Sequence, residues 1–281
     1  MKIIQAGRVL LTVIFVLSFT VAGCASTLLY NHADWLLTRQ VDQYFDLTRS
    51  QRSFVSARLG TLLEHHRHEA LPQYEDVIHQ VAARIQHGLS SEDVEWAFRQ
   101  YDRLRIDLLA RFASDGADFL RLVREPQLPH LKRALQKRLA EQEALLREPV
   151  QTRLAARRDR LLALAREWLG SVSREQEQQI TELVMAFPDT IPLIYAHQLQ
   201  RNDQLMALLE RRMQQDTPDK LRAWLTDQDA DPSFLEVTGQ FRHHLKGLLL
   251  ALDRTATPAQ RHHLSAKLDD LAHTVRKLHH T

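Results

Sequence analysis

The chain contains a single cysteine, Cys24, among 281 residues. One cysteine cannot form an intramolecular disulfide, and it excludes the zinc sites that are built from several cysteines. Glycine and proline are also scarce, with 8 and 9 residues, and aromatic residues make up only 7% of the chain. No stretch alternates apolar and polar residues for long enough to predict a sheet. With abundant Leu, Ala, Arg, Gln and Glu, these absences predict an all-α protein.

Signature motifs of common enzymes are missing as well. The chain has no glycine-rich phosphate loop, no G-x-S-x-G nucleophile elbow and no H-E-x-x-H zinc motif. Charged residues make up 26% of the chain, and no pair of Asp or Glu residues stands out among them. We therefore expect a non-enzymatic protein without catalytic residues, bound metal or cofactor.

The N-terminus has the layout of a bacterial lipoprotein signal. A short basic region with Lys2 precedes the apolar run Val9–Val21, which is too short to span a bilayer comfortably. The run leads into Val21-Ala22-Gly23-Cys24, which resembles the lipobox. The resemblance implies cleavage between Gly23 and Cys24 and attachment of a diacylglycerol group to the Cys24 sulfur.

This signal sets the expected domains and location. We expect residues 1–23 to be a removed signal peptide, residues 24–30 a lipidated start with a short tether, and residues 31–281 one helical body. Cleavage lowers the count of basic residues from 37 to 35, which equals the 35 acidic residues, so no nucleic acid partner is indicated. By analogy with bacterial sorting, Ala25 and Ser26 after the cysteine favour the outer membrane. The body is then expected in the cell envelope, anchored by lipid and facing the periplasm.

Three pairs of residues have the spacing of a capping box, in which a Ser or Thr accepts the third amide of a helix and a Gln reaches back. They are Thr48 with Gln51, Ser173 with Gln176, and Thr257 with Gln260. Apolar residues follow each cap at offsets of 7, 11 and 14: Val55, Leu59 and Leu62; Ile180, Val184 and Phe187; Leu264, Leu268 and Leu271. A cap alone does not require matching core positions, so the three copies indicate a repeated helical unit.

Breaks at proline and glycine divide the chain into helices, and helix starts recur about every 40–45 residues. The pattern predicts an elongated multi-helix bundle. Stacked helical hairpins with a unit of that length are the alternative. The polar loop from Asp227 to Pro232 is predicted to be the most mobile part of the body.

Histidine is abundant, at 15 residues. His65 and Glu69 lie one helical turn apart, but two ligands do not make a specific metal site. We therefore expect these histidines to lie on solvated faces of helices and to bind no metal. A weak metal site or a response to pH is the alternative.

The stretch from Arg121 to Arg166 carries twelve basic residues against five acidic ones. A basic surface attracts anionic lipid headgroups, envelope polymers or acidic protein segments. A solvated helix surface with pairs such as Glu143 and Arg147 is the other interpretation.

Two resemblances add to this reading. Most of the mature chain resembles a family of proteobacterial lipoproteins that is known only as a domain of unknown function, so no activity is implied. The matching residues are Tyr30-Asn31, Asp34-Trp35, Tyr44 to Thr48 with Gln51, and Leu71-Pro72 with Tyr74. Separately, Leu47-Thr48-Arg49-Ser50-Gln51 is similar to the L-T-x-x-Q motif of the small periplasmic Spy and CpxP proteins. Those proteins are helical and cradle-shaped, and they are associated with chaperoning and envelope stress.

The sequence therefore predicts a membrane-tethered, all-helical module that binds other envelope proteins, as a chaperone or an assembly factor. A carrier that holds a lipid or another apolar ligand between its helices is an alternative. An envelope protein with a weak response to metal or pH is a second alternative.

Overall fold

The computed structural model describes residues 30–280, and within that range it contains helices and no strand. The predicted all-α, multi-helix fold is confirmed. Among these residues, no helix is both long enough and apolar enough to cross a bilayer. The predicted cleavage and lipidation site, Gly23 and Cys24, lies outside the described residues.

Long helices follow one another with short connections. In the first half they are α3 (Ala33–Phe45), α4 (Arg49–His65), α5 (Leu71–Gln86), α6 (Ser91–Leu122) and α7 (Leu128–Leu146). A π-helical turn, η1 (His66–Ala70), joins α4 to α5, and a 3-10 turn, η2 (Glu125–Gln127), precedes α7. In the second half they are α8 (Val150–Leu169), α9 (Arg174–Ala186), α10 (Ile191–Glu210), α11 (Thr217–Leu225), α12 (Pro232–Thr255) and α13 (Pro258–His280).

Proline marks several of the helix starts. It occupies the first turn of α5, α7, α10, α11 and α12. An amide in the first turn has no partner inside the helix, so proline loses no hydrogen bond there and its fixed φ suits the helix. The breaks that the sequence predicts at Pro72, Pro192 and Pro232 are therefore helix starts.

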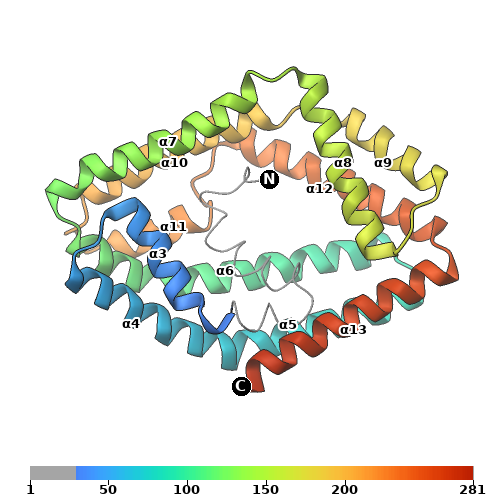
Figure 1. Ribbon diagram of the computed structural model, residues 1–281, viewed down its shortest axis with the longest axis horizontal. Helices are drawn as coiled ribbons and strands as arrows, with labels where there is room; N and C mark the ends of the chain where they lie inside the picture. Colours follow the sequence, from blue (N-terminus) through green and yellow to red (C-terminus); the bar gives the residue numbers. More distant parts are fainter. Residues whose placement is uncertain (1–29, 281) are drawn as a thin grey trace.

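The helices form a closed frame (Figure 1). Paired helices follow its outline: α7 with α10 at the upper left, α8 with α9 at the upper right, α5 with α13 at the lower right, and α3 with α4 at the lower left. The long helix α6 runs along the horizontal axis of the frame. Successive hairpins do not stack in a line, so the repeat is not one of 40–45 residues.

The repeated unit is instead half of the chain. In the first half, α3 packs on α4 and α7, and α4 packs on α6. In the second half, α8 packs on α9 and α13, and α9 packs on α12. The contacts thus relate α3, α4, α6 and α7 to α8, α9, α12 and α13, in the same order.

The two halves also exchange helices. The helix α5 of the first half packs on α13, and the corresponding α10 of the second half packs on α7. At the centre α6 contacts α12, with ion pairs of 2.5 Å between Asp102 and Arg242 and between Glu95 and Lys246. These contacts have the pattern of an internal two-fold repeat, to which α11 is an addition that packs on α6.

The buried apolar residues form two clusters. One joins α3, α4, α6, α7, α10 and α11, and it includes Leu59, Leu131 and Leu209. The other joins α5 and α13 with Tyr30 and part of α6, and it includes Leu71 and Val275. Seven of the nine apolar positions that follow the predicted caps are buried, and Leu264 and Leu271 are partly buried in the second cluster. These predicted core positions are confirmed.

Candidate functional site

The three predicted capping boxes are all present. The Thr48 hydroxyl accepts the Gln51 amide at 3.3 Å, and Gln51 Oε1 accepts the Thr48 amide at 2.9 Å. Matching bonds of 3.2 Å and 2.9 Å form in the other two boxes, Ser173 with Gln176 and Thr257 with Gln260. The prediction that these residues have a structural role in capping is confirmed.

Gln51 also pairs with a glutamine that the sequence analysis did not single out. Gln51 and Gln127 exchange two hydrogen bonds of 2.9 Å between their side-chain amides. Gln51 Nε2 also donates to the Leu122 carbonyl at 2.7 Å, and Gln127 Nε2 donates to the Phe45 carbonyl at 2.7 Å. This first glutamine pair joins the ends of α3 and α6 to the starts of α4 and α7.

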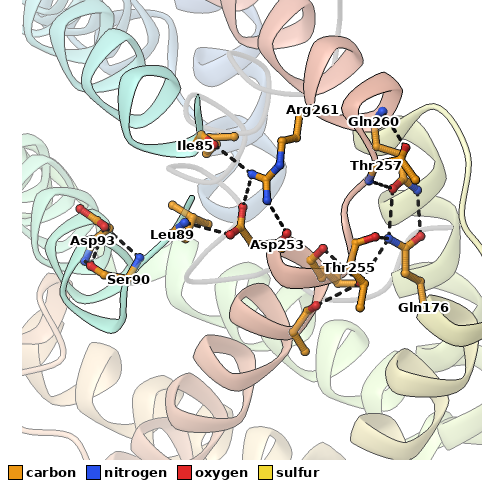
Figure 2. Close-up of polar contacts among 12 residues, drawn as sticks. Ile85, Leu89, Ser90, Asp93, Gln176, Asp253, Thr255, Thr257, Gln260 and Arg261 are labelled. Carbon is orange, nitrogen blue, oxygen red and sulfur yellow. Dashed lines mark hydrogen bonds and ion pairs between the residues drawn. The ribbon is translucent and has the colours of Figure 1, made fainter. Parts of the chain in front are cut away.

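The second half repeats the arrangement, as Figure 2 shows. Gln176 Nε2 donates to Gln260 Oε1 at 3.1 Å, and Gln260 Nε2 donates to Gln176 Oε1 at 2.8 Å. The same Nε2 atoms reach the carbonyls of Thr255, at 3.3 Å, and Ser171, at 2.8 Å. This second glutamine pair joins the starts of α9 and α13, which correspond to α4 and α7 in the repeat.

A signal for Gln127 does exist in the sequence. Gln127 Oε1 accepts the amide of Arg124 three residues before it, at 2.9 Å. Apolar residues follow Arg124 at offsets of 7 and 11, namely Leu131 and Leu135. Arg124 stands where the other copies have Ser or Thr, so the capping-box pattern does not identify this fourth copy. Its glutamine and its first two core positions have the same spacing as in the other copies.

The polar contacts around the second pair extend to α5 (Figure 2). Asp253, at the end of α12, accepts the Leu89 amide at 2.9 Å and Arg261 Nη1 at 2.7 Å. Arg261 also donates to the Ile85 carbonyl at 3.0 Å. The end of α5 is thus fixed to the corner where α12 turns into α13, which closes the frame.

The histidines do not assemble a metal site in the part of the chain that the structure describes. The predicted neighbours His65 and Glu69 do meet, at 2.9 Å. Between residues 30 and 280, no group of three or more His, Cys, Asp or Glu side chains is placed to hold a metal ion.

His66 is buried between two tyrosines. Its Nδ1 lies 2.9 Å from the Tyr30 hydroxyl, and its Nε2 lies 3.3 Å from the Tyr74 hydroxyl. Burial lowers the pKa of His66 to about 4 and raises the pKa of Tyr30 to about 12. The trio therefore stays uncharged at neutral pH, and it fixes Tyr30, the first described residue, to η1 and α5.

His66 makes stability depend on pH. Its pKa of about 4 in the folded chain lies below the value of about 6.5 in an unfolded chain, so between these values protons bind the unfolded state preferentially. We expect the free energy of unfolding to fall by about 2 kcal/mol from this residue alone between pH 7 and pH 5. His66→Gln should abolish that part of the loss in urea unfolding at the two pH values. His68→Gln, at an exposed histidine, should retain it, and equal losses in both variants would contradict the assignment.

The basic stretch from Arg121 to Arg166 divides into paired and unpaired residues. Arg147 binds Glu143 at 2.8 Å, as predicted, and Arg153 binds Asp189. Several cations of the stretch have no ion-pair partner among residues 30–280, and three of these are exposed on one side of α7. They are Lys132, Arg133 and Lys137, which we call the basic face of α7.

The start of α7, next to the basic face, packs on the end of α3, where His130 Nε2 lies 3.1 Å from the Gln43 carbonyl. Helix α7 forms the upper edge in Figure 1, whereas the start of α3 and the C-terminus lie at the lower edge. Because Tyr30 is only six residues after Cys24, the chain between them spans at most about 20 Å. A membrane that held Cys24 would therefore lie near the start of α3.

Comparison with known proteins gives a family and no activity. No curated protein and no solved structure matches the chain. Residues 43–234 match a family of unknown function, and this region includes the first glutamine pair and Gln176. Since the match covers more than half of the 281 residues, the chain belongs to the family of unknown function DUF6279.

Proposed function

We propose that this protein is a lipid-anchored, non-enzymatic module of the outer membrane that binds acidic segments of other envelope proteins. The binding surface is the basic face of α7, and the module acts as a chaperone or an assembly factor in the periplasm. The observation that carries the proposal is the set of three exposed cations on this face without an ion-pair partner in residues 30–280.

The charges on this face are not explained by helix stability. Arg133 and Lys137 are four residues apart, so like charges face each other and destabilise the helix slightly. The nearest acidic residue in sequence, Glu141, is directed to Arg138 at 3.5 Å instead. An anionic partner would supply the missing opposite charge and would be attracted over several ångströms.

Reversing the three charges tests the proposal. We expect the variant Lys132→Glu, Arg133→Glu, Lys137→Glu to lose about tenfold or more in the yield of crosslinked envelope proteins, because three contacts of roughly 0.5–1 kcal/mol each become repulsive. The measurement is photocrosslinking from α7 in intact envelopes, followed by mass spectrometry of the crosslinked peptides. Those peptides should carry a net negative charge.

A matched control variant separates the effect of the basic face of α7 from the effect of the net charge of the protein. Arg160→Glu, Arg174→Glu, Arg254→Glu makes the same change in net charge on α8, α9 and α12, at three exposed positions. It should retain the crosslinks. The proposal fails if both triple variants give the same partners in the same yields as the unaltered chain.

A further inference from the structure

We infer that one side of α3 lies on the bilayer that holds the lipid anchor, with Trp35 among the headgroups and Arg39 on a lipid phosphate. The inference rests on the lipid anchor of the proposed function but not on the basic face of α7. It adds a second contact with the membrane, which would fix the orientation of the body.

Trp35 is the most exposed tryptophan of the described chain. Its side chain is 56% exposed, whereas Trp96, Trp168 and Trp224 are half-buried. The Trp224 indole donates to the Arg201 carbonyl at 3.1 Å, but no hydrogen bond to another described residue is made by Trp35. An exposed indole with a free N–H is suited to a boundary between apolar and polar surroundings.

The indole belongs to a stripe of exposed residues along α3. Within α3, Trp35, Arg39 and Gln43 are exposed and follow one another at intervals of four residues, and the exposed Asn31 lies just ahead of the helix. Residues at that interval lie on one side of a helix. The stripe contains no carboxylate that would repel an anionic headgroup.

Arg39 complements Trp35 chemically. Its guanidinium lies 5.6 Å from the Trp35 ring centre, in a cation–π arrangement. The arginine can therefore stay beside the indole while its N–H groups bind phosphate oxygens, which arginine recognises well. Side chains of this kind keep their charged end at the headgroups and their stem on apolar surface.

The stripe is also held close to the anchor. Tyr30 is fixed by His66 at 2.9 Å, and Arg67 lies over the Tyr30 ring at 5.5 Å and donates to Asn31 at 3.1 Å. Cys24 is then within about 20 Å of a fixed point on the body. Trp35 follows Tyr30 by five residues, which is about 7 Å along a helix.

Tryptophan fluorescence tests the contact in the full chain with its own lipid, bound to vesicles of phosphatidylethanolamine and phosphatidylglycerol. The vesicles carry bromine on the acyl chains, either near the headgroup or near the terminal methyl. The difference between the unaltered chain and Trp35→Phe gives the emission of Trp35. We expect bromine near the headgroup to quench this emission at least twofold more than bromine near the methyl end.

Two variants serve as comparisons. Trp96→Phe should leave the quenching unchanged, and Arg39→Gln should reduce it. Equal Trp35 emission in brominated and plain vesicles, with the chain still bound to them, overturns the inference but leaves the anchor and the α7 face intact. Loss of the whole chain from the vesicles overturns the inference together with the anchor.

Discussion

Replacing Gln176 by alanine is expected to lower the free energy of unfolding by about 3–4 kcal/mol. The Gln176 side chain is fully buried, and its amide satisfies the Ser173 amide, the Thr255 carbonyl and both polar atoms of Gln260. Alanine leaves the Ser173 amide and the Thr255 carbonyl without these partners, and Gln260 retains only its bonds to Thr257 and Ser171. Each buried group that loses its hydrogen bond costs roughly 1–3 kcal/mol, and relaxation recovers part of the sum.

Urea unfolding measures this effect, and a second variant controls for the loss of a cap. Ser90 and Asp93 form a capping box with the same two backbone bonds, at 3.1 Å and 2.9 Å, but on an exposed surface without a partner glutamine. Asp93→Ala should therefore be much less destabilising. The double variant Gln176→Ala, Gln260→Ala should lower the free energy of unfolding by less than the sum of the two single variants. Either single substitution already removes the hydrogen bonds between the two glutamines, so the double variant loses them only once. Strict additivity would contradict the pairing.

The variant Asp227→Asn is expected to destabilise the protein by about 3 kcal/mol. Asp227 accepts a hydrogen bond from Arg201 Nη1 at 2.6 Å, and Arg105 and His197 lie 3.6 Å from its carboxylate oxygens. Arg201 is buried and stacks 4.0 Å above Trp224. Removing the carboxylate charge takes the Asp227 counterion away from this buried arginine, which is more costly than the loss of a surface pair.

Asparagine isolates the effect of charge in this experiment. Asp227 has a φ of 59°, in the left-handed region that Asn tolerates about as well as Asp. Asp219→Asn removes a charge from an exposed pair with Arg222 at 3.9 Å, and it should change stability by less than about 0.5 kcal/mol. Thermal or urea unfolding compares the two. Equal effects would mean that the buried cluster contributes no more than a surface pair.

The same cluster has a defined pH dependence. Burial acts to raise the pKa of Asp227, but the hydrogen bond from His197 and the charges of Arg201 and Arg105 hold it below its usual value. A carboxyl group of this kind contributes stability above the unfolded pKa of about 3.9, and that stability is lost as the pH falls through the folded pKa. Its loss therefore begins at lower pH than the loss caused by His66.

Asp227 also shows what the sequence leaves out about the loop that it begins. The polar residues from Asp227 to Pro232 predict the most mobile loop of the body, and the first of them forms ion pairs with side chains from α6 and α10. Local composition shows that a segment is not helical. It does not show whether distant arginines meet its carboxylate, since Arg105 is remote from Asp227 in the sequence.

The helix starts could be determined from the sequence by itself, because capping acts between residues three apart and the apolar offsets follow the turn of one helix. Thr48, Ser173 and Thr257 were found in this way with their buried core positions. The sequence also gives the all-α class through its composition, for the same local reasons.

Only the tertiary structure determines which distant groups the capping glutamines contact. Gln51 meets Gln127, and Gln176 meets Gln260, across 76 and 84 residues of chain. A side-chain amide has the same capacity to donate and accept wherever it lies, so the sequence does not show which amide will face it. Which cations remain unpaired on α7, and whether Trp35 is buried or exposed, also depend on helices that are distant in the sequence. Those features, which carry the proposed functions, arise only when the two halves of the chain close into one frame.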